Sequence, residues 1–254
     1  MLFVILPAYN EEENVGNILN DLYKLFKKKF DLLKTIIVVV DDGSTDNTLN
    51  VIKNFISTTD FDADFSVKII NHEHNKGLGE AIKSGFEYVL NTGNTQDVIV
   101  TLDCDSTHPV ELIPIMVNKI KDGIELVVAS RYVENSKVIG LSLTRRFLSF
   151  GARILFKLMF PIKNIKDYTS GFRAYKFETL KSAKEKIQPF FSEKDFSSTS
   201  DILIKLKRFN KNINAEELPL TLRYDLKVGK SKMKVWANVF KTLKLLIKRN
   251  FTNK

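Results

Sequence analysis

The sequence has little cysteine and no long apolar run, and each absence limits the class of protein. One cysteine among 254 residues leaves no partner for an internal disulfide, which fits a reducing cytosol. No apolar run reaches the length of about 18 residues that a membrane-spanning helix needs. Met1–Leu6 lacks a basic segment and is followed by Pro7, unlike a secretory signal peptide. We therefore expect a cytoplasmic protein without a transmembrane helix.

Acidic side chains are scarce in the second half of the chain, and this asymmetry predicts an anionic partner. Residues 1–130 hold 11 basic and 20 acidic side chains, a net charge of −9, whereas residues 131–254 hold 28 and 10, a net of +18. Nucleic acid, acidic lipid or a phosphate group would suit the basic half, with a general lysine bias as the alternative. The length fits one large domain or two small ones.

Short apolar segments alternate with amphipathic segments through the first half of the chain. Strands are predicted at 2–6, 36–40, 67–70, 98–102 and 126–129, with a helical pattern after each of the first four. This order indicates βαβ units and a mostly parallel α/β sheet, in which ligands bind beyond the carboxyl ends of the strands. The residues expected to share that edge are Tyr9, Glu11, Asp42, Lys76, Asp103, Asp105 and Arg131.

Asp103-Cys104-Asp105 follows the fourth predicted strand and is a candidate metal site. Two carboxylates at a strand end must meet water, a cation or a ligand, because burying an unpaired charge costs several kcal/mol. Hard oxygen ligands suit Mg²⁺ or Mn²⁺. The alternative is a polar turn in which Asp105 or Ser106 caps a helix that starts near Pro109. Cys104 is interpreted as a small filler residue.

Two other motifs argue against competing classes. Gly77-x-Gly79 lacks a third glycine and follows the third strand, so a dinucleotide-binding fingerprint is not indicated. His72-Glu73-His74 has the wrong spacing for a helical zinc pair, and we expect a solvent-exposed loop there. The basic residues are not interleaved with aromatics in a recognisable nucleic-acid module, so no nucleic-acid partner is expected.

Two later segments have the pattern of amphipathic basic helices. Ser142–Phe160 carries an apolar stripe and arginines on its other faces, which suits either a membrane-surface helix or a core-facing helix. In Met233–Arg249 most apolar residues, including Trp236 and Phe240, fall within one arc, and lysines lie opposite. We expect this segment to dock at a membrane interface, with packing back on the domain as the alternative.

Three motifs in order, Pro7-Ala8-Tyr9-Asn10-Glu11, Val39–Asp46 and Asp103-Cys104-Asp105, resemble the family 2 glycosyltransferases of the GT-A fold. Ser130-Arg131-Tyr132, Ser170–Tyr175 and Gly229–Met233 resemble the polyprenol-phosphate (dolichol-phosphate) mannosyltransferase branch, so the similarity covers about residues 2–235. The expected division is a GT-A domain at 1–232, with a nucleotide-sugar half (1–130) and an acceptor half (131–232). A C-terminal amphipathic helix and tail follow at 233–254.

The resemblance implies roles for individual residues. Pro7, Tyr9, Glu11 and Asp42 would hold the nucleoside, and Asp103 and Asp105 the divalent metal on the diphosphate. The wider nucleotide-sugar set adds Ala8, Lys76, Cys104 and Lys232, the last on a loop over the donor phosphates. Arg131, Arg145 and Ser149 would take the acceptor phosphate. Asp201, where the family usually has glutamate, would face the metal as a fourth catalytic residue beside Asp103, Asp105 and Arg131.

The expected function is inverting transfer of one sugar from a nucleotide donor to a polyprenyl phosphate at the cytoplasmic membrane face, with Mg²⁺ or Mn²⁺ as cofactor. GDP-mannose is the first donor choice and a UDP-sugar such as UDP-glucose the second. A phosphate acceptor is already anionic and needs cationic groups rather than a base. The alternatives are transfer to a glycan hydroxyl in cell-surface polysaccharide synthesis, with Asp201 as base, and a non-catalytic nucleotide-sugar sensor. A separate membrane-protein partner is also open.

Overall fold

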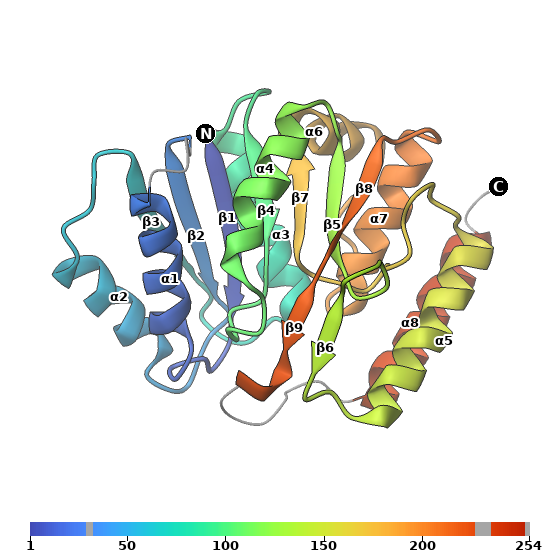
Figure 1. Ribbon diagram of the computed structural model, residues 1–254, viewed down its shortest axis with the longest axis horizontal. Helices are drawn as coiled ribbons and strands as arrows, with labels where there is room; N and C mark the ends of the chain where they lie inside the picture. Colours follow the sequence, from blue (N-terminus) through green and yellow to red (C-terminus); the bar gives the residue numbers. More distant parts are fainter. Residues whose placement is uncertain (29–32, 227–234, 252–254) are drawn as a thin grey trace.

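A seven-stranded sheet forms the centre of the molecule, in the order β3-β2-β1-β4-β7-β5-β8 (Figure 1). The structure is a computed structural model that describes residues 1–28, 33–226 and 235–251. The strands of the sheet are β1 (Leu2–Ala8), β2 (Thr35–Asp41), β3 (Phe65–Asn71), β4 (Val98–Thr101), β5 (Leu126–Ser130), β7 (Arg173–Lys176) and β8 (Ala215–Pro219). A separate parallel pair is formed by β6 (Lys137–Ile139) and β9 (Thr221–Arg223).

Helices cover both faces of the sheet, as Figure 1 shows. They are α1 (Val15–Lys27), α2 (Thr48–Thr58), α3 (Leu78–Thr92), α4 (Ile113–Lys121), α5 (Leu143–Met159), α6 (Phe177–Lys186), α7 (Ser197–Phe209) and α8 (Val235–Phe251). Two short 3₁₀ turns, Val110–Leu112 and Tyr224–Leu226, complete the elements. The predicted α/β class with helices on both faces is confirmed.

The apolar strands alternate between two cores. In β1, Val4 and Leu6 pack with α1 and α4, whereas Phe3 and Ile5 pack with α3 and α7. Successive side chains of a strand point to opposite faces, so a strand covered on both faces becomes apolar throughout. This explains why Leu2–Leu6 is an unbroken apolar run with at most 2% exposure.

The strand directions bring the predicted site loops to one edge. β1 pairs in parallel with β2 and β4, and β2 pairs in parallel with β3. β7 is antiparallel to both β4 and β5, so β4 and β5 point the same way. The carboxyl ends of β1 to β5 therefore share one edge, which is the lower edge in Figure 1. The parallel arrangement was predicted, and the antiparallel insertion of β7 was not.

Helices α5 and α8 lie side by side at one end of the molecule (Figure 1). Phe156 of α5 and Leu245 and Leu246 of α8 are buried, and they belong to the same apolar core as residues of α3 and α7. Other apolar side chains of the two helices are exposed: Phe147, Phe150, Ile154, Leu155 and Leu158 on α5, and Phe240, Leu243 and Ile247 on α8. Most of the described α5 stripe is thus exposed, whereas Met159 at its end packs against the core. In the described parts of the chain, no helix has both the length and the apolar content needed to cross a membrane.

Candidate active site

The loops after β1 and β2 are held to each other by hydrogen bonds. The Asn10 backbone N–H donates to Ser44 Oγ at 2.9 Å, and the Thr45 N–H donates to Asn10 Oδ1 at 2.8 Å. The Glu11 N–H donates to Thr48 Oγ1 at 2.8 Å. Asn10 adopts a left-handed backbone with φ 52°, a conformation that asparagine tolerates better than most residues. The motif containing Asn10 and Glu11 is therefore fixed in place before any ligand binds.

Asp42 joins the β2 loop to the loop after β3. Its Oδ1 accepts a hydrogen bond from the Lys76 N–H at 3.0 Å, and its Oδ2 accepts one from the Gly77 N–H at 2.8 Å. The ring of His72 lies 2.6 Å from Oδ1. These contacts leave Asp42 only 2% exposed.

The predicted nucleotide-sugar residues of the first three loops lie at one edge. Pro7, Tyr9 and Glu11 are partly exposed, and Lys76 is exposed. Ala8 is buried in the sheet. Their shared edge was predicted from the strand order and follows from the topology. Their binding roles stay predictions.

Asp103 and Asp105 occupy the loop after β4, and their surroundings fit a divalent cation. Gly171 lies so close to Asp103 that a Cβ there would sit 3.1 Å from Asp103 Oδ1, so the glycine keeps space open at this oxygen. Asp105 Oδ1 accepts hydrogen bonds from the Thr107 N–H at 3.2 Å and the Thr107 hydroxyl at 2.6 Å. The Asp103 N–H donates to His108 Nδ1 at 3.2 Å, which fixes the loop between the two acids.

The donor set also fits the preference of Mg²⁺ and Mn²⁺ for oxygen. Among the described residues, no group of three or more histidine, cysteine or acidic side chains gathers as a metal site. Mg²⁺ is commonly held by one or two carboxylates together with substrate phosphates. The two aspartates thus fit a metal that is completed by the diphosphate of a donor. Cys104 between them is buried at 3% exposure, in agreement with a filler residue.

Arg131 is held by a bidentate ion pair with Asp167. Its Nε and Nη2 donate to the two Asp167 oxygens at 2.8 and 2.7 Å, and Nη2 also donates to Thr169 Oγ1 at 2.6 Å. Burial disfavours the charge of both groups, but the ion pair outweighs it, so the pKa of Arg131 is raised and that of Asp167 is lowered. Among the described residues, the two Nη1 N–H groups of Arg131 have no partner. They are the donors of Arg131 that stay available for a ligand.

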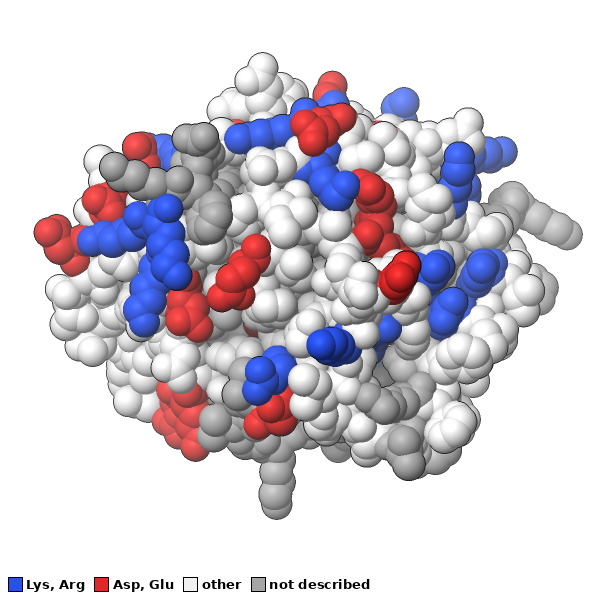
Figure 2. Space-filling model, viewed as in Figure 1, with Lys and Arg blue, Asp and Glu red and all other residues white. Residues whose placement is uncertain are grey.

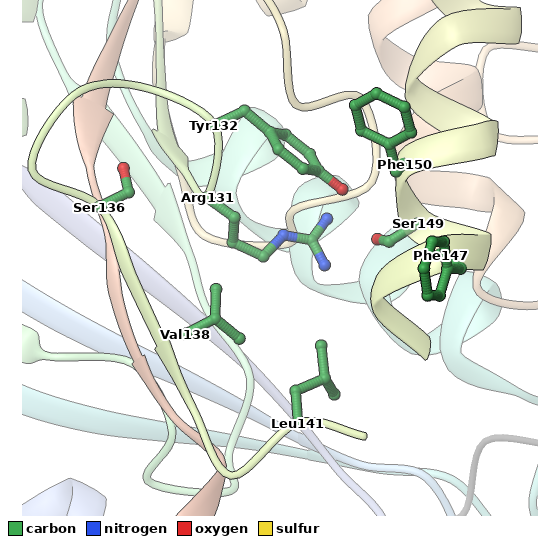
Figure 3. Close-up of a pocket in the computed structure, with 8 residues that line it drawn as sticks. All are labelled: Arg131, Tyr132, Ser136, Val138, Leu141, Phe147, Ser149 and Phe150. Atoms are coloured by element: carbon green, nitrogen blue, oxygen red, sulfur yellow. The ribbon is translucent and has the colours of Figure 1, made fainter. Parts of the chain in front are cut away.

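A cavity of about 470 Å³ lies beside Arg131 (Figure 3). Arg131 and Tyr132 enter it from the β5 loop, and Ser149 enters from α5. The rest of the lining is Ser136 and four apolar side chains: Val138, Leu141, Phe147 and Phe150. The guanidinium of Arg153, which is not part of the lining, lies 4.8 Å from the centre of the Tyr132 ring. Burial raises the pKa of the Tyr132 hydroxyl, which also interacts with Ser149. One end of the cavity is cationic and its walls are apolar.

Asp201 lies in a buried ion cluster. Its Oδ1 accepts from Arg249 Nε at 2.6 Å, and its Oδ2 accepts from Arg249 Nη2 at 2.9 Å and lies 2.6 Å from Lys205 Nζ. Asp201 is 1% exposed, and its partners lie on α7, α8 and the turn at Ser192. A carboxylate held by two cations is poorly placed to take a proton from a hydroxyl. The catalytic assignment of Asp201 stays a prediction, and these contacts give it a structural role.

Two predicted site residues lie beyond what the structure describes. Lys232 falls within 227–234, and the side chain of Arg145 on α5 is outside the described residues. Conversely, sequence reasoning missed Asp167 and Thr169, and it gave Tyr132 no role beyond its place in the Ser130-Arg131-Tyr132 motif. The one clue to Asp167 was its position just ahead of the Ser170–Tyr175 motif. Nothing in the sequence connected it with Arg131, which lies 36 residues earlier.

The structure thus has partly exposed loops at the carboxyl edge of its parallel strands, two aspartates in the loop after β4, and a cavity with one cationic end. The chain belongs to glycosyl transferase family 2, whose family model matches residues 3–183. It is 34% identical over 91% of its length to the dolichol-phosphate mannosyltransferase of Pyrococcus furiosus, and it spans 58% of that protein.

A second relative and a solved structure are also similar to this chain. The UDP-N-acetylglucosamine–dolichyl-phosphate N-acetylglucosaminyltransferase of Methanococcus voltae is 29% identical over 88% of this chain and 86% of its own. Glucosyl-3-phosphoglycerate synthase of Mycobacterium tuberculosis, solved with Mn²⁺, UDP-glucose and glycerol 3-phosphate, aligns with 98% of this chain and 79% of its own. That alignment has a TM-score of 0.66 at 19% identity, which supports the fold alone.

Proposed function

We propose that this chain transfers one sugar from a nucleotide donor to the phosphate of a polyprenyl phosphate, at the cytoplasmic face of a membrane. The observation that carries the proposal is the cavity beside Arg131, which combines a cationic end with apolar walls. A polyprenyl phosphate has the complementary structure, an anionic head on an apolar chain. The names of the two polyprenyl-type relatives support the same acceptor.

The residues of the site divide the chemistry between donor and acceptor. Arg131 Nη1 would orient the acceptor phosphate, since arginine suits directional phosphate contacts. A phosphate oxygen then attacks the anomeric carbon, the bond from that carbon to the diphosphate oxygen breaks, and the configuration inverts. Asp103 and Asp105 would hold Mg²⁺ or Mn²⁺, which when bound offsets the charge on the departing diphosphate. No general base is needed, because the attacking oxygen is already anionic.

The nucleotide of the donor, GDP or UDP, can be identified by offering the protein sugars carried on each. The resemblance to mannosyltransferases favours GDP-mannose, and the second relative named above makes a UDP-sugar the alternative. We expect metal-dependent formation of one sugar–phosphate lipid when GDP-mannose, UDP-glucose and UDP-N-acetylglucosamine are each offered with a short polyprenyl phosphate. EDTA should stop the reaction. Donor hydrolysis without a lipid product would instead favour a glycan hydroxyl as the acceptor.

Arg131→Ala should impair use of the acceptor and spare the donor. Loss of charged hydrogen bonds to a phosphate should lower kcat/KM for polyprenyl phosphate by about 10- to 100-fold. The Kd for the nucleotide, measured calorimetrically, should change little. Arg131→Lys keeps the charge that pairs with buried Asp167 and should be intermediate. Lys163→Ala, at an exposed lysine, is the matched control. An equal loss of donor binding would argue against the acceptor role.

The exposed apolar residues of α5 and α8 support direct contact with a membrane surface. Leu158 is 74% exposed and Phe240 is 69% exposed, on neighbouring helices. Their burial in the interfacial region would be favourable, at roughly 1.5–3 kcal/mol for a full side chain. Leu158→Glu should therefore lower binding to anionic vesicles about tenfold or more in a flotation assay. Ile115→Glu, at an exposed residue of α4, is the control. Equal vesicle binding by both variants would contradict the contact.

The other classes have less support. Transfer to a glycan hydroxyl needs a base, and Asp201 is enclosed by Arg249 and Lys205. On the face shown in Figure 2, basic side chains form separate groups among acidic and uncharged ones rather than one band that could follow a nucleic-acid backbone. Turnover in the donor panel separates an enzyme from a nucleotide-sugar sensor.

A further inference from the structure

His72 forms a buried chain of contacts that the sequence did not indicate. Its Nδ1 lies 2.6 Å from Asp42 Oδ1, and its Nε2 lies 2.9 Å from Ser84 Oγ of α3. His72 is 7% exposed, so the expectation of a solvent-exposed loop is wrong for this residue. It holds for Glu73 and His74, which are exposed. The chain places an imidazole directly behind the carboxylate assigned to the nucleoside.

The hydrogen bonds of Asp42 use most of its accepting capacity. An ionised carboxylate only accepts, and it has about four lone-pair positions, two on each oxygen. The hydrogen of the His72–Asp42 contact must therefore be on Nδ1. Oδ1 then accepts from His72 and from the Lys76 N–H, and Oδ2 accepts from the Gly77 N–H. With these described donors in place, Oδ1 is full and Oδ2 has one position left.

The backbone around Asp42 resists a rearrangement that would free Oδ1. Gly43 and Gly77 have left-handed backbones, with φ 66° and 97°. A Cβ at Gly43 would lie 2.3 Å from the carbonyl carbon of His74, and one at Gly77 would lie 2.5 Å from the carbonyl oxygen of Lys194. The loop after β2 is therefore in backbone contact with the loop after β3, and the loop after β3 is in backbone contact with Lys194. The backbone donors of Lys76 and Gly77 to Asp42 are fixed by these contacts.

We propose that His72 is a specificity-determining residue, which fills Oδ1 of Asp42 and so selects uracil over guanine in the donor nucleotide. Uracil presents a single N–H, at N3, between two carbonyls. Guanine presents two neighbouring donors, N1–H and the N2 amino group, which a carboxylate matches only with one open position on each oxygen. Because Asp42 is 2% exposed, an N–H left without an acceptor there is not compensated by water.

This inference rests on the proposed nucleotide-sugar function and narrows it. It favours a UDP-sugar over GDP-mannose, against the order suggested by the resemblance. Cytosine is an informative comparison, because it has the size of uracil but a bare nitrogen acceptor at N3. That nitrogen would face the Asp42 carboxylate with no hydrogen between them.

The test compares UDP, GDP and CDP by calorimetry on the full chain with Mg²⁺. We expect UDP to bind about tenfold or more tightly than either of the others, as one unpaired buried donor or one acceptor–acceptor contact predicts. Equal or tighter binding of GDP would overturn the base assignment and leave the proposed function standing. Binding of none of the three would instead overturn the proposed function.

A variant tests the role of His72 itself. His72→Phe keeps a ring of similar size but removes the Nδ1 donor, so Oδ1 regains an open position. The ratio of GDP to UDP dissociation constants should then fall about tenfold, whatever the common loss of affinity. Ser84→Ala removes the other partner of His72 without changing the bonds to Asp42, and its ratio should match that of the wild type. A folded His72→Phe protein, verified by its melting curve, that keeps the wild-type ratio would exclude the specificity role.

Discussion

Asp105→Asn should reduce sugar transfer by at least about 100-fold and leave the fold intact. Asparagine keeps the size of the side chain and an oxygen that can accept from the N–H and hydroxyl of Thr107. It removes the charge that, with Asp103, would hold the metal on the donor diphosphate. Because only two carboxylates of the described residues stand at this point, the loss of one charge is not compensated by a third acidic ligand.

The measurement for Asp105→Asn is a titration of transfer activity with Mg²⁺ and with Mn²⁺. The midpoint of the titration should move to higher metal concentration, and saturating activity should stay far below that of the wild type. Asp122→Asn, at an exposed carboxylate that follows α4, is the control for the substitution itself. Wild-type turnover by Asp105→Asn in the presence of EDTA would show that the metal assignment is wrong.

The nucleotide-side edge could be predicted because its signals are local. Each of the five predicted strands is a short apolar run that ends in polar residues, and parallel order then places those ends together. β7 could not be predicted in this way, since its first residue, Arg173, is charged yet fully buried. Its guanidinium donates to the carbonyl oxygens of Thr199 and Tyr168. Tyr168 is close in the chain, but Thr199 belongs to α7, so no local apolar pattern marks this strand in the sequence.

The cavity beside Arg131 was predictable only in part, for a related reason. Arg131 and Ser149 follow from the resemblance, but the orientation of Arg131 depends on Asp167, which no spacing rule connects to it. Helical periodicity predicts α5 and α8 but not which face is covered. Leu245 lies outside the apolar arc of α8, yet it is 1% exposed, whereas Phe240 within that arc is 69% exposed. Packing of α8 against α5 and α7 decides this, and it lies outside the pattern of either helix.

Asp201→Ala should destabilise the protein strongly. Arg249 and Lys205 would lose their shared counter-ion in a site where Asp201 is 1% exposed and Lys205 is also 1% exposed. Breaking a buried ion pair from one side costs about 3–5 kcal/mol, which corresponds to a fall in Tm of about 6 to 20 °C for a chain of this size. Arg249 belongs to α8 and Asp201 to α7, so we expect α8 to detach from α7 before the rest of the protein unfolds.

The same variant separates the structural role of Asp201 from the predicted catalytic one. Calorimetric melting gives the change in Tm, and transfer is then measured well below the lowered transition. A structural residue predicts substantial activity in the folded fraction, whereas a catalytic residue predicts a folded protein without turnover. Asp225→Ala breaks the exposed ion pair with Arg223 and should leave the melting curve almost unchanged, since exposed pairs contribute little. A Tm for Asp201→Ala equal to that of Asp225→Ala would show that the buried cluster does not hold α8 in place.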